Sequence, residues 1–294
     1  MTQIAGLFLL AALIVGAFAT IGAEPVLAAL PFELALIGGT ALATLLIANS
    51  RDTVVAALTG LGHAIRGSRW TRAAHGDLLA VLVALLSRLR REGPIALEAE
   101  LEEPAGAPMF QQAPQLRADG RVLGFLVEVA RHHALPGGQT VASDQVRLLR
   151  QRLIADRRRA AQALHAVADA LPALGIVAAV LGIIKTMGAI DQSTEVIGTM
   201  IATALLGTFL GVFLSYGLVG PLAARFEQVI EEDARALDVI AAAFEGHARG
   251  LSPSLAGEFA RTPLPPHLRP DPTELAHAAE RTRFSIRTVR RQAG

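Results

Sequence analysis

The sequence is first notable for the residue types it lacks. It contains no cysteine, which excludes disulfide bridges, thiolate metal sites and cysteine nucleophiles. Lys185 is the only lysine, so arginine carries almost all of the positive charge. The formal net charge is only +1, and the overall charge therefore gives no argument for binding nucleic acid.

Motifs of soluble catalysis are also missing. The chain has no phosphate-binding GxxxxGK[ST], no HExxH, no GxSxG and no GxGxxG after a strand pattern. His132 and His133 are adjacent, but neighbouring residues on a helix point in different directions. No second pair of ligands accompanies them. We therefore predict that the protein is not an enzyme and has no metal site.

Long apolar blocks set the fold class. The chain is 52% hydrophobic with a mean hydropathy of +0.44, which is too apolar for an ordinary soluble domain. A helix needs ~20 apolar residues to span a bilayer, and four blocks supply them with at most one charge each: residues 1–23, 25–50, 171–190 and 192–224. The first block lacks the basic start of a signal peptide, so we expect a retained spanning helix.

The arginines predict the topology. Residues 51–170 hold sixteen arginines and the chain after residue 221 holds ten more, whereas the connections 23–31 and 189–195 hold none. Positive charge marks the cytoplasmic side of a membrane protein. We therefore place the middle segment, the tail and both termini in the cytoplasm.

These patterns predict an all-α integral membrane protein in four parts. We expect two spanning helices joined by a short periplasmic loop, a cytoplasmic helical domain, two further spanning helices, and a cytoplasmic helix with a tail, at residues 1–50, 51–170, 171–224 and 225–294. Gly93-Pro94 and residues 135–138 should end helices. Residues 143–169 contain no glycine or proline, and this helix should run straight into the third span. We expect the last twenty or so residues to be disordered.

Small residues recur at helical spacing within the spans. The fourth span carries Thr199, Thr203, Gly207, Gly211 and Ser215, and the third carries Gly175, Ala179, Gly182 and Thr186. In lipid, helices associate by close backbone packing, which needs small residues. These faces therefore predict helix contacts inside a bundle.

The membrane interior offers few ionisable groups. The only candidates are Glu33 and Lys185, and both lie near the ends of their apolar blocks. A chain that moved ions alone should carry an ionisable or strongly polar group there, but the interior offers hydroxyls such as that of Thr208. Either nothing is transported, or the titratable group comes from another chain.

Four segments resemble one known family, in the order in which they occur in it. They are PFELALIGGTALATLLIANS at 31–50, RREGPIALEAELEEP at 90–104, LPALGIVAAVLGIIKTMGAIDQSTEVIGTMIATALLGTFLGVFLSYGLVGPLA at 171–223 and SPSLAGEFAR at 252–261. Together they resemble the MotA family of flagellar motor stator subunits, which belongs to the MotA/TolQ/ExbB proton-channel proteins.

The resemblance implies a role in flagellum-dependent motility and chemotaxis. It implies a ring of five subunits in the bacterial inner membrane around two copies of a MotB-type partner. That partner brings one span with an essential aspartate and a domain that grips peptidoglycan. Proton passage drives the ring, whose cytoplasmic parts push on the rotor switch complex. No cofactor is implied, and the partner's aspartate would supply the missing acid.

The resemblance also assigns membrane positions. Pro172 and Pro221 match prolines that are thought to couple ion movement to cytoplasmic motion. Pro172 also suits the first turn of a helix, whereas Pro221 interrupts a helical pattern that continues past it. Thr208 and Thr186 are assigned to the ion path, although the Thr208 hydroxyl could instead bond the carbonyl one turn back. Ala179 matches a position that is threonine in sodium-driven relatives. Sodium prefers oxygen ligands, so we predict protons.

Arg90 and Glu98 match the cytoplasmic charges that face the rotor in this family. Exposed charges attract weakly and are screened by salt, which suits a contact that is made and broken at each step. The stretch before the third span departs from the family pattern. It is often acidic in relatives but is basic here, with Arg150, Arg152, Arg157, Arg158 and Arg159. This indicates altered charge pairing with the rotor or with anionic membrane lipid.

Three other functions stay open. A TolQ/ExbB-like energiser of outer-membrane processes usually has one span before the main cytoplasmic segment, so two spans and the Arg90-to-Glu98 spacing favour the motor. A helical scaffold without ion flux would not depend on Thr208. A stand-alone transporter is opposed by the lack of a central ionisable residue.

Overall fold

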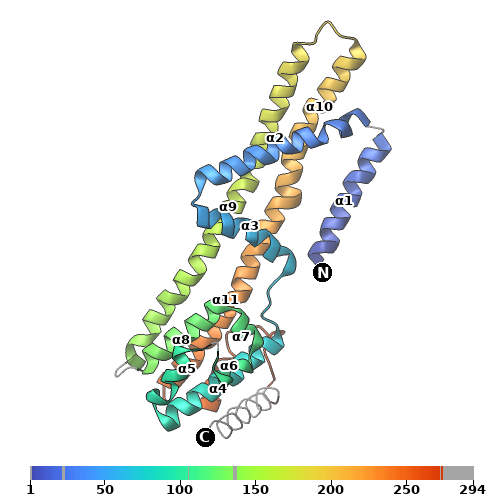
Figure 1. Ribbon diagram of the computed structural model, residues 1–294. Coiled ribbons are helices and arrows are strands. Elements are labelled where there is room, and N and C mark those ends of the chain that lie inside the picture. The colour runs from blue at the N-terminus through green and yellow to red at the C-terminus, as the bar shows by residue number, and fades with distance from the viewer. Residues whose placement is uncertain (1, 22–23, 105, 135–137, 272, 274–294) are drawn as a thin grey trace. The chain divides into compact units, whose positions relative to one another are not determined.

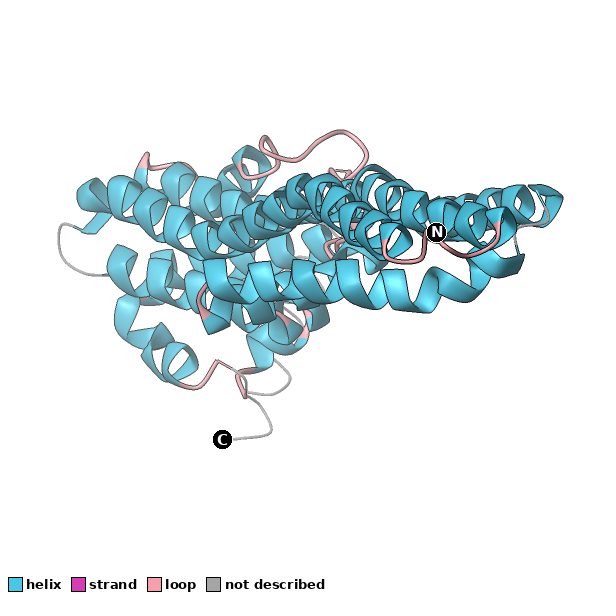
Figure 2. Cartoon of the chain, turned by 90° about the horizontal axis from the view of Figure 1, so that it is seen from above, coloured by secondary structure: helices cyan, strands magenta, loops and turns pink. Residues whose placement is uncertain are grey.

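The computed structural model is mostly helical in the part of the chain that it describes, which comprises residues 2–21, 24–104, 106–134, 138–271 and 273 (Figure 1). No strand is present in these ranges (Figure 2), which confirms the all-α prediction. The chain divides into two compact units: Met1–Gly67 with Asp156–Val229, and Ser68–Ala155 with Ile230–Gly294. We call the first the membrane unit and the second the cytoplasmic unit.

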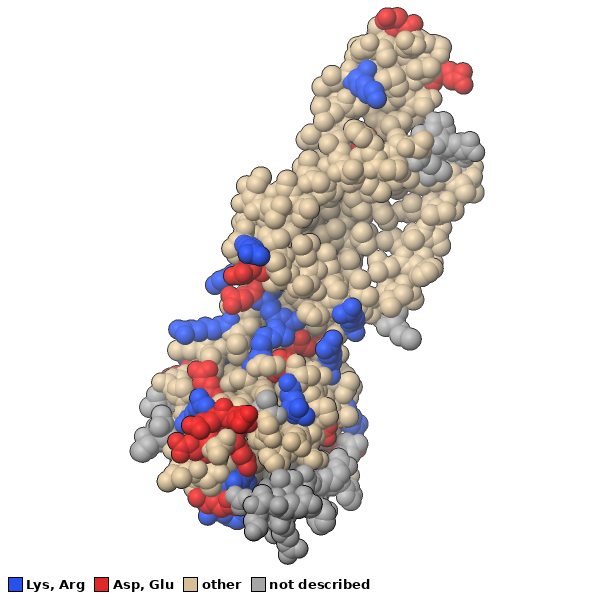
Figure 3. All heavy atoms as spheres, viewed as in Figure 1, with Lys and Arg blue, Asp and Glu red and all other residues tan. Residues whose placement is uncertain are grey.

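The membrane unit contains the long apolar helices. They are α1 (Thr2–Ile21), α2 (Glu24–Ala48), the span-forming part of α9 (Gly138–Met187), and α10 (Thr194–Phe213), which continues through a π-helix (Leu214–Val219) into α11 (Gly220–Ala248). Four stretches are long and apolar enough to cross a membrane, at Gln3–Thr20, Ala28–Ala48, Asp144–Met187 and Thr194–Ala248. The four predicted spans are therefore confirmed. Along α2, the last part of α9 and α10, the visible surface is mostly uncharged (Figure 3).

Three of these helices share one apolar core. α2 lies across α10 (Figure 1), and the core is built by two residues each from α2, α9 and α10: Ile37, Ala41, Leu171, Ala178, Leu206 and Leu210. α1 adds Phe18, whose ring meets Phe209 edge-on with centroids 5.8 Å apart. The short α3 (Arg51–Arg66) follows α2 and buries Val54 against Leu45 and the α9 residue Ala163.

The two prolines that the resemblance assigns to coupling lie within long helices. Pro172 lies inside α9, so its alternative explanation as a first-turn proline is wrong. Pro221 is the second residue of α11, separated from the π-helix by Gly220. Because proline has no N–H, the carbonyl one turn earlier loses its usual helical partner. Single π turns are a common response to such an insertion or loss, and they often mark functional sites.

The cytoplasmic unit is held by large side chains. It contains α4 (Arg72–Glu92), η1 (Pro94–Leu97), α5 (Glu98–Glu102), α6 (Pro108–Gln111), α7 (Pro114–Ala118), α8 (Gly120–Ala134), α12 (Pro253–Phe259) and parts of α9 and α11. Its fully buried side chains include Leu78, Leu79, Leu82, Leu85, Leu86, Met109, Phe110, Leu116, Phe125 and Leu126. This is the core expected of a protein in water.

Glycine and proline end the helices largely where the sequence predicts. α4 ends before Gly93, whose φ of +79° favours glycine, and Pro94 then begins η1. α9 is one helix into the third span, as predicted. The predicted break at 135–138 falls mostly outside the described residues, and so does the predicted disorder of the last twenty residues, so the two remain predictions.

Candidate functional site

The contact between α9 and α10 is made by backbone. A methyl group built on Gly175 would lie 2.7 Å from the Gly207 carbonyl oxygen and 2.9 Å from the Gly211 Cα. A methyl group built on Gly211 would lie 2.6 Å from the Leu171 carbonyl oxygen. Real Cβ atoms do not approach backbone so closely, so glycine at these positions sets the spacing of the two helices.

The same contact continues along both helices. A methyl group on Gly182 would lie 2.7 Å from the Ala204 Cβ. The buried hydroxyl of Thr186 donates to the Gly182 carbonyl, with 2.9 Å between the two oxygens. Ser215 is only 2% exposed and lies in the π-helix. The residues assigned to helix packing thus lie along the α9–α10 contact or directly beyond it.

Two of the three residues assigned to the ion path, Ala179 and Thr208, lie near the middle of this contact, whereas Thr186 is the second-last residue of α9. Ala179 is 7% exposed, and its backbone nitrogen lies 3.3 Å from a Cβ built on Gly207. Thr208 follows Gly207 and is half-buried. Thr203 bonds its hydroxyl to the Thr199 carbonyl, but the Thr208 hydroxyl makes no hydrogen bond to any described residue. It is therefore available as a polar group, although its role in an ion path remains a prediction.

Glu33 is the group that the sequence pattern misplaced. It stands near the start of its apolar block, but α2 is inclined across α10, so its side chain reaches the middle of the α9–α10 contact. Its Oε2 lies 3.2 Å from a Cβ built on Gly207. The residue is 5% exposed, and Oε2 has no hydrogen-bond partner in the described structure. The crossing of α2 is a tertiary feature that residue spacing does not reveal.

The predicted rotor charges lie on either side of the turn made by Gly93 and η1, and we call the end of α4, this turn and α5 the α4–α5 hairpin. Arg90 is in the last turn of α4 and Glu98 is the first residue of α5, and both are exposed. Arg90 also donates to the Leu251 carbonyl, with an N–O distance of 3.3 Å. The described residues include no ion pair between Arg90 and Glu98. Both charges therefore face solvent, while the Arg90 guanidinium also contacts the segment between α11 and α12.

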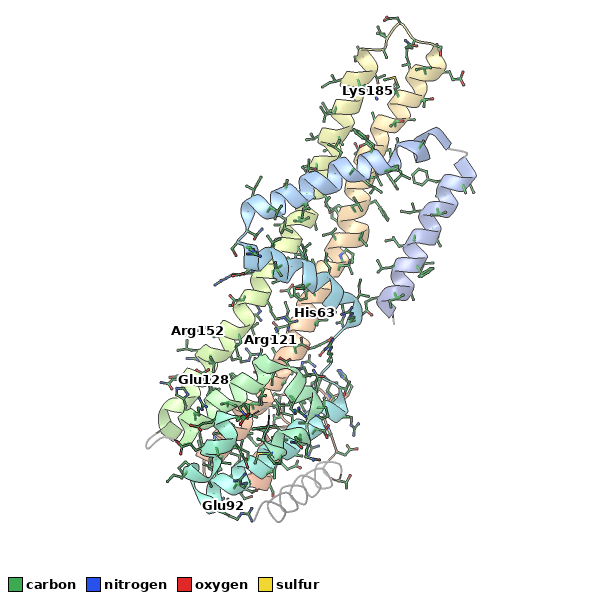
Figure 4. The ribbon with its side chains drawn as sticks, viewed as in Figure 1. His63, Glu92, Arg121, Glu128, Arg152 and Lys185 are labelled. Carbon is green, nitrogen blue, oxygen red and sulfur yellow. The ribbon has the colours of Figure 1, made fainter. Side chains whose placement is uncertain are left out.

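Arg88 holds this hairpin, and residue spacing alone gave no sign of it. The residue is 4% exposed. Its guanidinium donates to Glu100 at 2.5 Å and to the Ala96 carbonyl at 2.8 Å. Its Nε lies 3.5 Å from Glu92, which is labelled at the end of α4 in Figure 4. One buried cation thereby joins α4, η1 and α5, whose ends carry Arg90 and Glu98.

The two adjacent histidines have different surroundings. His132 bonds the Glu128 carbonyl within α8, whereas the Nε2 of buried His133 lies 2.8 Å from the Nδ1 of His247 on α11. Burial, followed by the neighbouring His247, lowers the pKa of His133 to about 4. Burial, followed by the charge of Arg90, lowers the pKa of His247. The described residues contain no group of three or more His, Cys, Asp or Glu that could hold a metal ion.

Comparison with known proteins decides the family. Residues 4–93 match the family model of the motility protein A N-terminal region, and residues 138–238 match that of the MotA/TolQ/ExbB proton channel family. Motility protein A of Escherichia coli K12 is 32% identical over 248 residues, which cover 83% of each chain. This chain belongs to the motility protein A family. Chemotaxis protein LafT of Vibrio parahaemolyticus is 30% identical over 82% of this chain and 85% of its own.

Solved structures of motility protein A complexes share the fold. The Campylobacter jejuni MotAB structure superposes with a TM-score of 0.72, covers 90% of this chain and 96% of its own, and is 20% identical. The flagellar MotAB stator complex of Bacillus subtilis gives a TM-score of 0.71 with 92% and 98% coverage and 18% identity. The four-span helical architecture is therefore that of motility protein A.

The charge of the basic stretch before the third span is partly balanced by acids of the same chain. Arg150 forms a two-atom contact with Asp238 of α11, and its Nη2 lies 3.0 Å from Oδ2. Arg159 pairs with Asp156, one turn away on α9. Internal acids thus neutralise part of the charge. Arg152, labelled in Figure 4, projects from the same stretch of α9.

Proposed function

We propose that this chain is the stator subunit of a bacterial flagellar motor. Together with a MotB-type single-span partner, it forms a proton channel that converts proton flow into torque on the rotor. The observation that carries the proposal is the 32% identity to motility protein A of E. coli over 83% of both chains. The alignment is long enough to include both spanning pairs and the cytoplasmic segment.

The membrane unit suits a channel that is completed by another chain. Its α9–α10 contact is rigid because glycine backbones meet there, and the half-buried Thr208 supplies a hydroxyl beside it. The partner's aspartate binds the travelling proton. Ala179 offers no side-chain oxygen, which supports protons over sodium as the ion. No cofactor is needed.

The cytoplasmic unit suits force transmission. The π-helix before Pro221 interrupts the regular hydrogen bonding of a long helix that enters both units. Bending of the helix at this point would move the α4–α5 hairpin, which carries Arg90 and Glu98. We place five such subunits in a ring, with the rotor switch complex against those charges. Arginine placement supports cytoplasmic termini in the inner membrane, and the basic part of α9 suits anionic lipid.

A TolQ/ExbB-like energiser is the second candidate. It is favoured by the match of residues 138–238 to the family model that covers TolQ and ExbB as well as MotA. The match of residues 4–93 to the motility protein A N-terminal model favours the motor. If the chain were such an energiser, deleting its gene would impair outer-membrane integrity or uptake.

The experiment is deletion of the gene in the native host, followed by swimming assays and electron microscopy. We expect intact flagella that do not turn, with rescue by the wild-type gene. Reversal of both charges (Arg90→Glu with Glu98→Lys) should rescue poorly, whereas Arg91→Glu, an exposed neighbour on α4, should rescue well. Normal swimming of a strain that has no second stator would contradict the proposal, and outer-membrane defects would then support the energiser.

Ion choice needs a separate measurement. Swimming speed should not change when sodium is removed from the medium, because the predicted path lacks a sodium ligand at Ala179. The Ala179→Thr variant tests whether an added hydroxyl introduces sodium dependence. Wild-type cells that stop in sodium-free medium would overturn the proton assignment.

A further inference from the structure

Glu33 is a buried acid within a membrane-spanning helix. It is 5% exposed, and its Oε2 has no hydrogen-bond partner among the described residues. Ionisable groups inside a membrane are rare, and when they persist they commonly mark ion pathways or proton relays. Glu100 also has a buried oxygen without a partner, but its carboxylate is bound by Arg88, whereas Glu33 pairs with no cation among the described residues.

The carboxyl group occupies a space that glycine leaves open. Its Oε2 lies 3.2 Å from the point where a side chain on Gly207 would begin, and the backbone nitrogen of Ala179 lies 3.3 Å from the same point. Thr208 is the next residue along α10. Helices α2, α9 and α10 therefore bring an acid, a glycine gap and the predicted ion-path residues together.

The charges around Glu33 do not compensate an ionised form. Residues 2–21 of α1 contain no charged residue. The charged residues nearest the turn between α9 and α10 are Lys185, Asp191 and Glu195, and all three are exposed. Figure 4 shows Lys185 near this turn. None of them pairs with Glu33 in the described structure. An unpaired carboxylate in an apolar setting is disfavoured relative to the neutral acid, so the group holds its proton in this conformation.

We propose that Glu33 is a proton-binding site contributed by this chain to the ion path, beside Gly207 and Thr208. The site rests on the proposed function and adds an acid of this chain to that of the partner. Release breaks the carboxyl O–H bond and passes the proton to a water molecule in the path, which leaves a carboxylate. Uptake from a hydronium ion reverses the step. The change of charge adjusts the contact between α2 and α10, so the site tunes flux and its pH dependence.

The charge state can be measured without motility. The stator complex in lipid nanodiscs at pH 8, where exposed carboxyl groups are ionised, should show the infrared C=O stretch of a neutral carboxyl. Glu33→Gln should weaken that band and leave only the part that comes from the partner's aspartate, whereas Glu195→Gln, which changes an exposed acid in the first turn of α10, should retain it in full. An unchanged band in Glu33→Gln would show that Glu33 is ionised and would overturn the proposal.

Motor torque at a series of pH values tests the role in the path. Glutamine keeps the shape of the side chain but binds no proton, so Glu33→Gln should lower torque several-fold and flatten its pH profile. Glu33→Asp should recover part of both, at matched membrane levels and matched co-purification of the partner. A Gln variant with wild-type torque and profile, or one that performs as well as Asp, would overturn the site. Swimming that does not depend on the gene at all would instead defeat the proposed function.

Discussion

The membrane unit and the cytoplasmic unit are both helical, yet different side chains hold their helices together. In the membrane unit the decisive contacts are glycines that let α9 and α10 meet at backbone distance. In the cytoplasmic unit they are leucine and phenylalanine side chains buried around α4. Burying leucine drives association in water but gives nothing in lipid, where close packing must replace it. The solvent of each unit therefore dictates its core.

Buried polar groups differ in the same way. In the cytoplasmic unit the Arg88 guanidinium donates to Glu100 and to the Ala96 carbonyl, and His133 has an imidazole partner. Single atoms of these groups, such as Arg88 Nε and His133 Nδ1, lack a hydrogen-bond partner, but each side chain is bonded through another atom. In the membrane unit Glu33 has an unpartnered oxygen and no hydrogen bond or ion pair to any described residue. A stable fold in water requires buried charges to be paired, so an unpaired group held within a membrane core points to a role in function.

The largest effect should come from breaking the buried ion pair of the cytoplasmic unit. Arg88→Met keeps most of the side-chain volume but leaves Glu100 and the Ala96 carbonyl without their donor. Losing one partner of a buried pair costs about 3 kcal/mol or more. Hydrogen exchange in the detergent-solubilised chain should show faster exchange of the α4-to-α5 amides. Arg91→Met, an exposed neighbour, is the control, and equal exchange in the two variants would contradict the bracing role.

The next effect is a loss of stability in acid that is confined to the cytoplasmic unit. The pKa of His133 falls from 6.5 to about 4 on folding, so the unfolded chain binds the proton more readily. The stability contributed by neutral His133 is present above pH 6.5 and is lost as pH falls toward 4, by at most about 3 kcal/mol. The melting temperature of the cytoplasmic unit, measured within the intact chain, should therefore fall as the pH is lowered from 6.5 toward 4.

Substitution separates the two adjacent histidines. His133→Gln should reduce the acid dependence, because glutamine does not titrate, while His75 and His247, whose pKa values burial also lowers, account for the remainder. His132→Gln should leave the dependence in place, since that side chain bonds only the Glu128 carbonyl of its own helix. Acid lability that survives His133→Gln in full would assign the effect to other groups.

Residue spacing predicted the helices and their ends better than the contacts between helices. The four apolar blocks, the break at Gly93-Pro94 and the continuous helix into the third span follow from local chemistry and are present in the structure. The position of Glu33 depends on the inclination of α2, and the link between Arg88 and Glu100 depends on how η1 turns. Neither produces a periodic signal, because each arises only when separate segments fold against one another.

The third effect tests the core of the membrane unit. Gly175→Ala places a methyl group 2.7 Å from the Gly207 carbonyl, and relieving such overpacking costs ~1–3 kcal/mol. The amount of folded complex extracted from membranes should fall. Gly38→Ala is the matched control, because a methyl group there meets nothing within 4 Å. Equal yields would show that backbone proximity does not hold the α9–α10 pair.

The smallest effect concerns a feature that the two units share. Ser193 caps α10 and Ser252 caps α12, and each hydroxyl accepts from a backbone N–H three residues on, with an N–O distance of 3.4 Å. Replacing either serine by alanine should cost ~1 kcal/mol, whereas Ser254→Ala, an exposed serine within α12, should cost almost nothing. Thermal melts of the solubilised protein measure this. Both serines lie outside the stretches that are apolar enough to cross a membrane, so similar costs would mean that the units differ only within those stretches. A much larger cost at Ser193 would show that the membrane unit also depends on its helix ends.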